Sequence, residues 1–311
     1  MKLSVVIPVY YNEPNLWPLY NDIKEKILSR QDFECEIVLV NDGSKDKSYQ
    51  IMQEISKEDK RVRIFSLSRN FGSHAAILCG LDQCTGDCAV IKAADLQEPT
   101  ELILEMLESW KKGFNVVLAA RKSRPESGFS KFFSNLYYWI VRKTSFPNMP
   151  KSGFDIYLID RKVINVIKEL DEKNSALTGQ ILWSGFRTDI VYYDRLERTA
   201  GESRWTLKKK IRLVSDTLFS FSTVPITFVS AVGAISFFVA VVWAFVIIVF
   251  KLTGQIEITG WTSLFIFSLA AFGVIMLTLG IIGNYLWRAF DASRNRPPYI
   301  IEDDNSMDLK R

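Results

Sequence analysis

Short apolar runs alternate with amphipathic stretches along the amino-terminal part of the chain. The apolar runs have the length of single strands and end in polar turns; they cover residues 3–9, 35–40, 62–67, 88–92 and 116–120. Between them, apolar residues recur with helical spacing at residues 16–28, 48–55, 73–81 and 101–110. This alternation of strands and helices predicts an α/β domain with a mostly parallel, doubly wound sheet.

Two far longer apolar stretches follow this domain, at residues 225–250 and 261–286. Each is longer than the ~20 residues that an α-helix needs to cross the hydrocarbon core of a bilayer. A buried helical hairpin in a soluble core is the alternative interpretation, but such helices are usually shorter and carry a polar face. The pattern therefore favours two transmembrane helices, which we expect within residues 224–288.

Basic residues lie at both outer ends of the predicted hairpin. They are Lys208, Lys209, Lys210 and Arg212 before the first span, and Arg288, Arg294 and Arg296 after the second. The loop between the spans, residues 251–260, carries one lysine and one glutamate. Because basic residues stay on the cytoplasmic side, we expect the α/β domain and both termini in the cytoplasm. Polar residues 10–13 also end the first apolar run too early for a signal peptide.

The segments around the hairpin complete the predicted domain organisation. Residues 1–204 form the α/β domain, and residues 205–223 carry apolar side chains at helical spacing beside several basic residues. That spacing is typical of an amphipathic helix at a membrane interface, although packing against the α/β domain explains it equally well. The aromatic stretch at residues 129–141 is a second candidate for such a contact. Residues 289–311 are expected to form a cytoplasmic tail.

Composition narrows the classes of function. The 311 residues have a formal net charge of +4, which is too small, and too concentrated beside the hairpin, to indicate nucleic-acid binding. The four cysteines, Cys35, Cys79, Cys84 and Cys88, are expected to be reduced thiols, since Cys84 and Cys88 lack the second pair of a metal site. With His74 as the one histidine, a Ser-His-Asp triad is a poor candidate.

Polar side chains follow four consecutive predicted strands at the point where each ends. The ends carry, in order, Tyr10 with Asn12 and Glu13, then Asp42, then Ser68 with Arg69 and Asn70, and then Asp95 with Gln97 and Glu98. Ligands of doubly wound sheets bind beyond these carboxyl ends. Carboxylates there can accept hydrogen bonds from a base or ribose, and arginine and backbone amides bind phosphate. A tight turn or helix N-cap explains Asp42 alone equally well, but four such ends in succession indicate a ligand site.

Several segments, taken in order, form a more specific pattern. They are residues 4–10, 41–44, 67–72, 94–99, 155–161, 198–205, 283–288 and 296–301. This ordered set resembles the family 2 inverting glycosyltransferases of the GT-A fold. Within that family it resembles the polyprenyl-phosphate glycosyltransferases, such as the dolichyl-phosphate mannose synthases and the bactoprenol glucosyltransferases of O-antigen modification. The resemblance covers nearly the whole chain and implies a GT-A nucleotide-sugar-binding domain in residues 1–204.

The resemblance implies that one sugar is transferred, with inversion, from a nucleotide donor to a lipid phosphate. UDP-glucose is the favoured donor, and undecaprenyl phosphate in the inner membrane of a bacterium is the favoured acceptor. The positions that would contact the donor are Pro8, Tyr10, Glu13, Asp42, Arg69 and Gln97. Related proteins form tetramers, so a homo-oligomer is expected, and a flippase and a downstream glycosyltransferase are further candidate partners.

The donor diphosphate and the lipid phosphate repel each other, so cations must be fixed around both before reaction. The candidates are Arg121, Lys131 and Ser134 for the lipid phosphate, and Arg198, Ser203 and Arg204 for the donor diphosphate or a closing loop. Asp155 matches the residue proposed as base in the family. A lipid monophosphate, with a second pKa near ~6, is already mostly dianionic at neutral pH. A role for Asp155 in orienting a substrate is therefore equally open.

Asp95 matches the second acid of the family's metal-binding Asp-x-Asp, which implies Mg²⁺ or Mn²⁺ as cofactor. Ala93 stands where the first aspartate is usual. Because Mg²⁺ can be bound by one or two carboxylates together with substrate phosphates, we expect Asp95, with Gln97 or Glu98, to hold it more loosely. Arg204 stands where lysine is more usual, which keeps the charge and changes the geometry.

Two other functions remain open. A processive polysaccharide synthase is suggested by Arg204-Trp205, which is similar to part of the Gln-x-x-Arg-Trp motif of that group, although Gly201 replaces the glutamine. Two spans are also few for moving a polymer outward. A catalytically silent anchor that binds nucleotide or recruits a flippase is the other alternative, suggested by Ala93.

Arg198→Ala should weaken donor binding, because it removes a cation expected beside the diphosphate. Titration of the purified chain with a nucleotide sugar measures the dissociation constant. Wild-type affinity in this variant would contradict the predicted role of Arg198.

Overall fold

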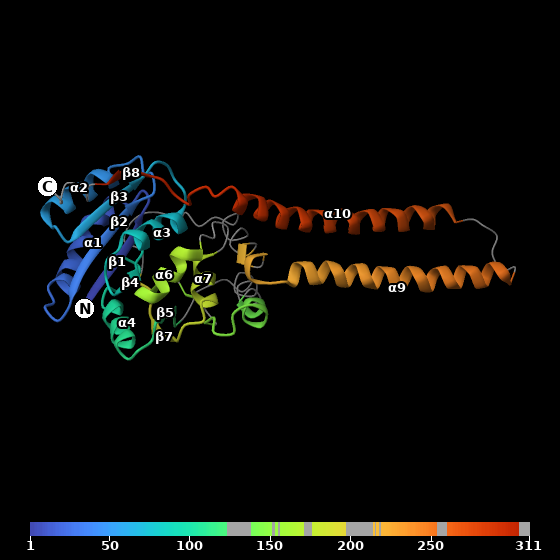
Figure 1. Cartoon of the computed structure of the whole chain (residues 1–311), viewed down its shortest axis with the longest axis horizontal. Coiled ribbons are helices and arrows are strands. Elements are labelled where there is room, and N and C mark those ends of the chain that lie inside the picture. Colours follow the sequence, from blue (N-terminus) through green and yellow to red (C-terminus); the bar gives the residue numbers. More distant parts are fainter. Residues whose placement is uncertain are drawn as a thin grey trace. The chain divides into compact units, whose positions relative to one another are not determined.

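The structure is a computed structural model that describes residues 1–122, 138–150, 153–154, 156–170, 176–196, 214, 216–217, 219–253 and 260–304. The chain divides into two compact units. One contains Met1–Val214 together with Arg296–Arg311, and the other is Ser215–Asn295. In Figure 1 the second unit is recognised by its two long helices, coloured orange to red.

The first unit is built on one sheet, which has eight strands within the described residues. They are β1 (Lys2–Val9), β2 (Glu34–Asn41), β3 (Val62–Leu67), β4 (Cys88–Ile91), β5 (Val116–Arg121), β6 (Ile156–Asp160), β7 (Thr188–Tyr193) and β8 (Ile301–Asp304). Their order across the sheet is β7-β5-β6-β4-β1-β2-β3-β8 (Figure 1). β6 and β8 run antiparallel to their neighbours, and the remaining pairs are parallel. The prediction of a mostly parallel sheet is confirmed.

Helices cover both faces of this sheet. One face carries α1 (Leu16–Ile23), α2 (Ser48–Glu58) and α4 (Leu102–Lys111), and the other carries α3 (Ser73–Gln83), α6 (Arg161–Leu170) and α7 (Leu177–Trp183). Successive side chains of a strand point to opposite faces of the sheet. Val5 and Ile7 are therefore buried under α1, α2 and α4, and Val6 is buried under α3, α6 and α7. The result is the three-layer, doubly wound architecture that the alternating pattern predicts.

The path of the chain through the sheet predicts where a ligand binds. From β1 the chain moves outward through β2 to β3, and it then returns to β4 on the other side of β1. The loops that follow β1 and β4 therefore leave in opposite directions, and doubly wound sheets bind ligands between such loops, at the carboxyl ends of the two strands. We call this region the crevice. β5 and β7 end at the same edge, since both are parallel to β4 through the intervening antiparallel β6.

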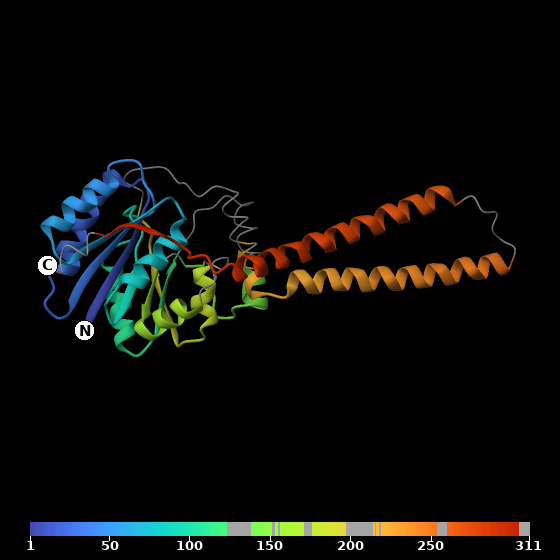
Figure 2. The same cartoon turned by 45° about the horizontal axis from the view of Figure 1, so that its top comes forward.

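β6, α6, α7 and β7 were not predicted, and two further elements differ from the expected ones. The helix expected at residues 16–28 is α1 followed by a π-helical turn, Lys24–Leu28, because apolar spacing does not distinguish the two kinds of turn. The carboxyl-terminal tail contributes β8, which pairs with β3 (Figures 1 and 2). A four-residue strand is too short for its alternation to be recognised in the sequence.

The second unit contains α9 (Val224–Leu252) and α10 (Trp261–Ser293). Their apolar segments, Val224–Phe250 and Phe267–Ser293, have mean hydropathies of 2.8 and 1.9, and the most apolar part of each is 0% buried inside the protein. A core helix of that composition would be buried against the rest of the protein. Both helices are long and apolar enough to be candidate membrane spans.

The predicted amphipathic helix at residues 205–223 lies largely outside the described residues, as does the aromatic stretch up to residue 137. The described end of the predicted amphipathic helix is helical at residues 219–221 and belongs to the second unit. There the ring of Phe219 lies 5.3 Å from that of Tyr285, and Arg288 donates a 2.7 Å hydrogen bond to Asp216.

At the amino edge of the sheet, Glu36 of β2 joins β1 to the turn before β4. Its carboxylate accepts hydrogen bonds from the Ser4 hydroxyl at 2.7 Å and the Thr85 amide at 2.6 Å, and lies 3.1 Å from the Lys2 ammonium. Burial by itself raises the pKa of Glu36, but the hydrogen bonds from Ser4, Thr85 and Lys2 outweigh burial and hold the pKa below its ordinary 4.5. The ionised carboxylate therefore stabilises the fold.

Glu36→Gln should lower the free energy of unfolding at pH 7 by about 1.5–3 kcal/mol, the range for hydrogen bonds to a charged group. A carboxyl group whose pKa falls on folding stabilises the protein above its unfolded pKa, and this contribution is lost as the pH drops. The wild-type chain should therefore lose stability below a pH of about 4.5, and the variant should lose less. Thermal unfolding at pH 7 and pH 4 measures both effects. Glu34→Gln, at the exposed start of the same strand, is the control, and equal effects of both changes would contradict the assignment.

Candidate functional site

The loop after β1 is held against the start of α2 by two serine hydroxyls. The amide of Tyr11 donates to Ser44 Oγ at 3.0 Å, and the amide of Asn12 donates to Ser48 Oγ at 3.0 Å. Tyr11 has a φ of 52°, in the left-handed region that side-chain-bearing residues seldom adopt. Such strain concentrates at binding and active sites, and here it lies one residue after the half-buried Tyr10, at the crevice between β1 and β4.

Glu13 and Pro8 flank this loop. The Glu13 carboxylate accepts a 3.2 Å hydrogen bond from the amide of Lys47, immediately before α2, where a helix has unpaired amides and a positive dipole end. Pro8 lies opposite Val40, one residue before β1 ends. Both residues lie at the carboxyl edge, and their predicted contacts with the donor stay predictions.

The Asp42 carboxylate faces the loop that follows β3. Asp42 is 2% exposed, and its oxygens accept hydrogen bonds from the amides of Phe71 at 2.7 Å and Gly72 at 3.0 Å. Hydrogen bonds to an ionised acceptor are stronger than neutral ones, so this contact fixes residues 68–72 relative to β2. In this structure Asp42 therefore positions the loop of Arg69, whereas direct contact with a base stays a prediction.

Gly43 allows the loop at residues 68–72 to lie close against the end of β2. Its φ is +68°, and a Cβ added there would lie 2.5 Å from the carbonyl carbon of Arg69. Any side chain would therefore displace the loop or strain the backbone. Arg69 itself is exposed, with its guanidinium carbon 4.1 Å from the centre of the Phe71 ring. The stacked, exposed cation is available to an anionic ligand at the crevice edge.

Asp95 and Gln97 lie in the loop after β4, on the other side of the crevice. Asp95 is half-buried and accepts a 3.4 Å hydrogen bond from the amide of Gln97, and Leu96 between them has a φ of 57°. The Gln97 carbonyl accepts a 2.9 Å hydrogen bond from the amide of Leu196, and its side-chain oxygen accepts one from Arg195. Arg195 was not among the predicted site residues; its position just after a strand end was the available signal.

Lys92 was also not predicted, and it lies directly below this loop. The residue is 1% exposed, and its ammonium donates a 2.7 Å hydrogen bond to the Glu98 carbonyl. Burial lowers the pKa of Lys92, while the negative charges of Glu98, Asp22 and Asp95 oppose that shift. A lysine at the end of an otherwise apolar run was the sequence signal. The ammonium holds the far end of the Asp95 loop and adds a fixed positive charge beside it.

The residues present fit a weakly held hard cation. The Ala93 side chain has no donor atom, and within the described residues no group of three or more His, Cys, Asp and Glu side chains could hold a metal ion. Asp95 nevertheless offers a carboxylate at the crevice. Mg²⁺ typically keeps several waters and binds one or two carboxylates together with substrate phosphates, so one such ligand is compatible with a cation bound along with the donor.

The remaining predicted site residues divide into two groups. Arg121 ends β5 at the carboxyl edge, opposite Tyr193 of β7. Lys131, Ser134, Asp155, Arg198, Ser203 and Arg204 lie outside the described residues, and their roles stay predictions. The residue after Asp155, Ile156, begins the antiparallel β6 and therefore lies at this edge too.

His74 has a structural position. Its Nδ1 accepts a 3.3 Å hydrogen bond from the amide of Leu177, which joins α3 to α7. Burial lowers the pKa of His74 to about 4, so the imidazole is neutral at pH 7. A neutral ring also suits the first turn of a helix, where the dipole disfavours a cation.

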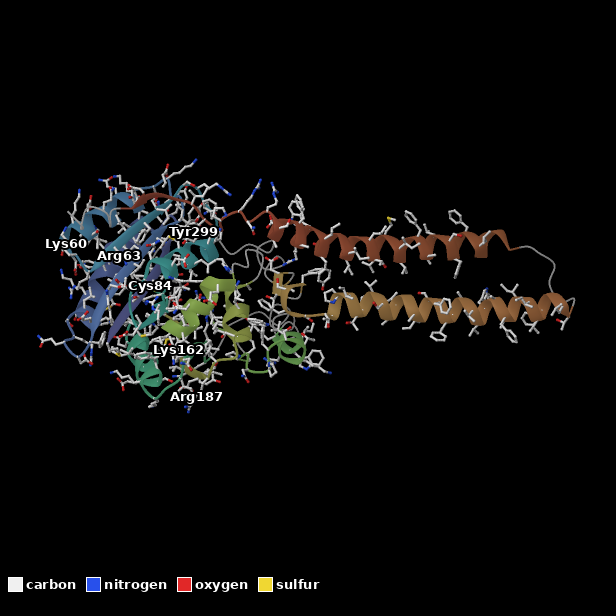
Figure 3. The ribbon with its side chains drawn as sticks, viewed as in Figure 1. Lys60, Arg63, Cys84, Lys162, Arg187 and Tyr299 are labelled. Atoms are coloured by element: carbon white, nitrogen blue, oxygen red, sulfur yellow. The ribbon has the colours of Figure 1, made fainter. Side chains whose placement is uncertain are left out.

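A cavity of about 420 Å³ lies at the opposite, amino edge of the sheet. Its lining includes Lys60 and Arg63, which Figure 3 labels. Acidic neighbours neutralise much of its charge, since Arg61 lies 2.8 Å from Asp59 and Arg63 lies 3.7 Å from Glu36. Ligands of doubly wound sheets bind at the other edge, so we assign the candidate site to the crevice.

Comparison with known proteins identifies the family of the chain. The family model described as Glycosyl transferase family 2 matches residues 4–167. The chain is 38% identical over 312 residues to the uncharacterized glycosyltransferase YkcC of Bacillus subtilis (strain 168), covering 100% of this chain and 96% of the relative. It is 33% identical over 305 residues to the bactoprenol glucosyl transferase of Shigella phage SfV, covering 98% and 99%.

Among solved structures, the mannosyltransferase PcManGT from Pyrobaculum calidifontis, in complex with GDP-Man and Mn²⁺, aligns with a TM-score of 0.48 and 17% identity. The alignment covers 68% of this chain and 60% of that one. The doubly wound sheet with its carboxyl-edge site and the family match define a glycosyltransferase of the GT-A fold. The chain belongs to glycosyltransferase family 2.

Lys92→Met keeps the length of the side chain and removes the ammonium below the Asp95 loop. We expect the free energy of unfolding to fall by about 1–3 kcal/mol, because the Glu98 carbonyl loses the buried donor that it accepts from. Glycosyl transfer should fall by roughly 100-fold, as expected when catalytic groups shift by about 1 Å. Denaturant unfolding and a transfer assay measure the two effects.

Lys112→Met, at the exposed carboxyl end of α4, is the matched control and should change neither quantity. A Lys92→Met chain with wild-type stability and turnover would show that the ammonium does not hold the loop.

Proposed function

We propose that this glycosyltransferase transfers a single sugar from a nucleotide sugar to a polyprenyl phosphate, with UDP-glucose and undecaprenyl phosphate as the leading pair. The observation that carries the proposal is its similarity to a bactoprenol glucosyl transferase over 98% of this chain and 99% of the relative. That span includes the catalytic domain, the two apolar helices and the returning carboxyl-terminal strand. Similarity confined to the catalytic domain would have left the identity of the acceptor undetermined.

The donor enters the crevice at the carboxyl ends of β1 and β4. Tyr10 and Asp42 flank its nucleotide, and Arg69 provides a cation for the diphosphate. Gln97, which Arg195 and Leu196 hold in place, lines the other side beside Asp95. Arg198, Ser203 and Arg204 follow this segment along the chain and complete the donor contacts. In this arrangement the loops of Arg69 and Asp95 approach the donor diphosphate from opposite sides of the crevice.

Asp95 is the residue that would hold a Mg²⁺ or Mn²⁺ ion together with the donor phosphates. When bound, such an ion neutralises the negative charge that builds on the departing diphosphate. Lys92 fixes the loop that carries Asp95 through its hydrogen bond to the Glu98 carbonyl. Because this cation is buried, its field at the loop is less screened than that of a surface lysine.

In the transfer itself, an oxygen of the acceptor phosphate attacks the anomeric carbon from the face opposite the leaving group. The new carbon–oxygen bond forms as the bond to the nucleotide diphosphate breaks, and the bonding electron pair leaves with the diphosphate. The acceptor is already ionised, so Asp155 needs only to orient it or the sugar, although a base role remains open. Arg121, Lys131 and Ser134 offset the repulsion between the two phosphates.

The membrane segments bring the lipid to this reaction. Two spans with basic residues at their outer ends predict that the catalytic domain and both termini lie on the cytoplasmic side of a bacterial inner membrane. A polyprenyl phosphate carries its phosphate at the membrane surface and its chain in the bilayer. Tethering the catalytic domain to the same membrane raises the local concentration of this acceptor.

The proposal is tested by supplying the full-length chain in detergent with undecaprenyl phosphate, Mg²⁺ or Mn²⁺, and one radiolabelled donor at a time. The donors are UDP-glucose, UDP-galactose, UDP-N-acetylhexosamines and GDP-mannose. One sugar per lipid phosphate is the expected product. Long polymer would instead indicate a processive synthase, and no transfer from any donor would indicate a silent nucleotide-binding protein.

Asp95→Asn should reduce transfer by about 100-fold or more, because it removes the charge that stabilises the cation beside the diphosphate. The initial rate with the preferred donor is the measurement. Asp32→Asn, at an exposed ion pair on the amino edge, is the control and should retain wild-type rates. Equal rates in Asp95→Asn and the wild type would remove Asp95 from the site.

A further inference from the structure

The carboxyl-terminal segment of the chain completes the sheet beside the candidate donor site. β8 pairs antiparallel with β3, with Ile301 opposite Leu67 and Asp303 opposite Ser66. Without it, β3 would be an edge strand with unpaired backbone groups. The segment belongs to the same compact unit as the catalytic domain, although α9 and α10 precede it in the chain.

Two tyrosine hydroxyls attach this segment to helices of the catalytic domain. One tyrosine belongs to a helix and the other to the segment. Tyr49 of α2 donates a 2.6 Å hydrogen bond to the Asp303 carboxylate. Tyr299, labelled in Figure 3, donates to the carboxylate of Asp82 on α3. The side chains of Tyr299 and Ile301 also pack against the core layer that contains α3. The segment is therefore attached by side chains on both faces of the sheet, besides the backbone ladder.

The segment reaches the donor loop directly. The amide of Ser68, the residue before Arg69, donates a 3.0 Å hydrogen bond to the Ile300 carbonyl. The pairing of β3 with β8 shifts register between Ser66 and Leu67: Ser66 lies opposite Asp303 and Leu67 opposite Ile301, so the extra residue, Glu302, belongs to β8. A bulge of this kind bends the strand that carries it, here β8, and such bulges are common beside active sites.

The loop at residues 68–72 is thus held at both ends. Asp42 accepts the amides of Phe71 and Gly72 at one end, and Ile300 accepts the amide of Ser68 at the other. Arg69 lies between these two contacts. Loss of either contact would leave the exposed guanidinium free to move with the backbone that carries it.

We propose that β8 is a positioning element of the donor site: through its ladder with β3 and the preceding Ile300 carbonyl it fixes the loop that presents Arg69 to the donor diphosphate. The proposal rests on the proposed function only in assigning a nucleotide diphosphate as the ligand of Arg69. It goes beyond that function because it makes donor affinity depend on residues that follow the second membrane helix. Residues 294–300 join α10 directly to β8, so the membrane hairpin and the donor loop are connected by a short stretch of chain.

The first experiment compares two carboxyl-terminal deletions of the full-length chain in detergent. Deletion of residues 299–311 removes β8 and Tyr299, and deletion of residues 305–311 leaves both in place as the matched control. The probes are UDP and GDP with Mg²⁺, titrated by calorimetry. We expect roughly five- to tenfold weaker binding after the longer deletion, as for the loss of one or two hydrogen bonds, and no change after the shorter one.

A second pair of variants tests the contacts of β8 without deleting it, so the result does not depend on whether the longer deletion folds. Tyr49→Phe with Tyr299→Phe removes the two hydroxyls that fix β8 and keeps the rings, and Tyr192→Phe, on an exposed side chain of β7, is the control. The double variant should raise the KM for the nucleotide sugar by roughly two- to fivefold, with the KM for the lipid acceptor unchanged. A general loss of stability would affect both substrates, so the separation of the two constants identifies a positioning role.

Amide hydrogen exchange provides a readout that needs no ligand. Exchange at Ser68 should become faster in the double variant, while exchange in the β1–β2 core stays at the wild-type rate. Wild-type nucleotide affinity, KM and Ser68 exchange in the double variant would overturn the proposal. If the wild-type chain transfers no sugar to any polyprenyl phosphate, but the variant shows faster Ser68 exchange and weaker nucleotide binding, the proposed function fails and the role of β8 stands.

Discussion

The hydrogen bonds that the buried Asp42 carboxylate accepts from Phe71 and Gly72 determine how the loop that carries Arg69 is held. A carboxylate that is 2% exposed must be paired, because an isolated buried charge is very unfavourable. The loop after β3 therefore has to lie within reach of β2, and Gly43 is the residue that lets its backbone approach so closely. These contacts fix the backbone that carries Arg69, so the position of its exposed side chain depends on them.

Charge is arranged differently on the other side of the crevice. Where the family usually has two acids after β4, this chain has Ala93 and Asp95, so the loop presents less negative charge to a cation. Below it the buried Lys92 ammonium holds the Glu98 carbonyl, and Arg195 and Leu196 hold Gln97 from the segment after β7. The Asp95 loop is thus fixed by two contacts to its backbone, from Lys92 and Leu196, and one to the Gln97 side chain, from Arg195. A ligand set with few charges depends more on such fixed geometry than one in which several carboxylates surround the ion.

Much of this fold could be predicted from the sequence because its strands are buried on both faces. The first five strands are continuous apolar runs between amphipathic helices, and the structure has them within one or two residues of the expected bounds. β6, β7 and β8 were not predicted. β6 is only five residues long, β7 lies at a sheet edge with half-exposed side chains, and β8 pairs with a strand more than two hundred residues away, which local patterning does not encode. For the site, strand ends identified Asp42, Arg69 and Asp95 as polar groups at one edge. Lys92 was missed because its ammonium acts on a backbone carbonyl, a partner that no sequence motif reveals.

The place of β8 in the chain has a consequence for biosynthesis. Domains generally fold from the amino terminus as the ribosome releases them, and the first seven strands of this sheet emerge before either apolar helix. The eighth is translated only after both helices have been made. The newly made domain therefore waits with an open sheet edge until the hairpin has left the ribosome. β3 can therefore gain its partner strand only after both apolar helices have been synthesised, so the sheet of the first unit is completed last by the end of the chain.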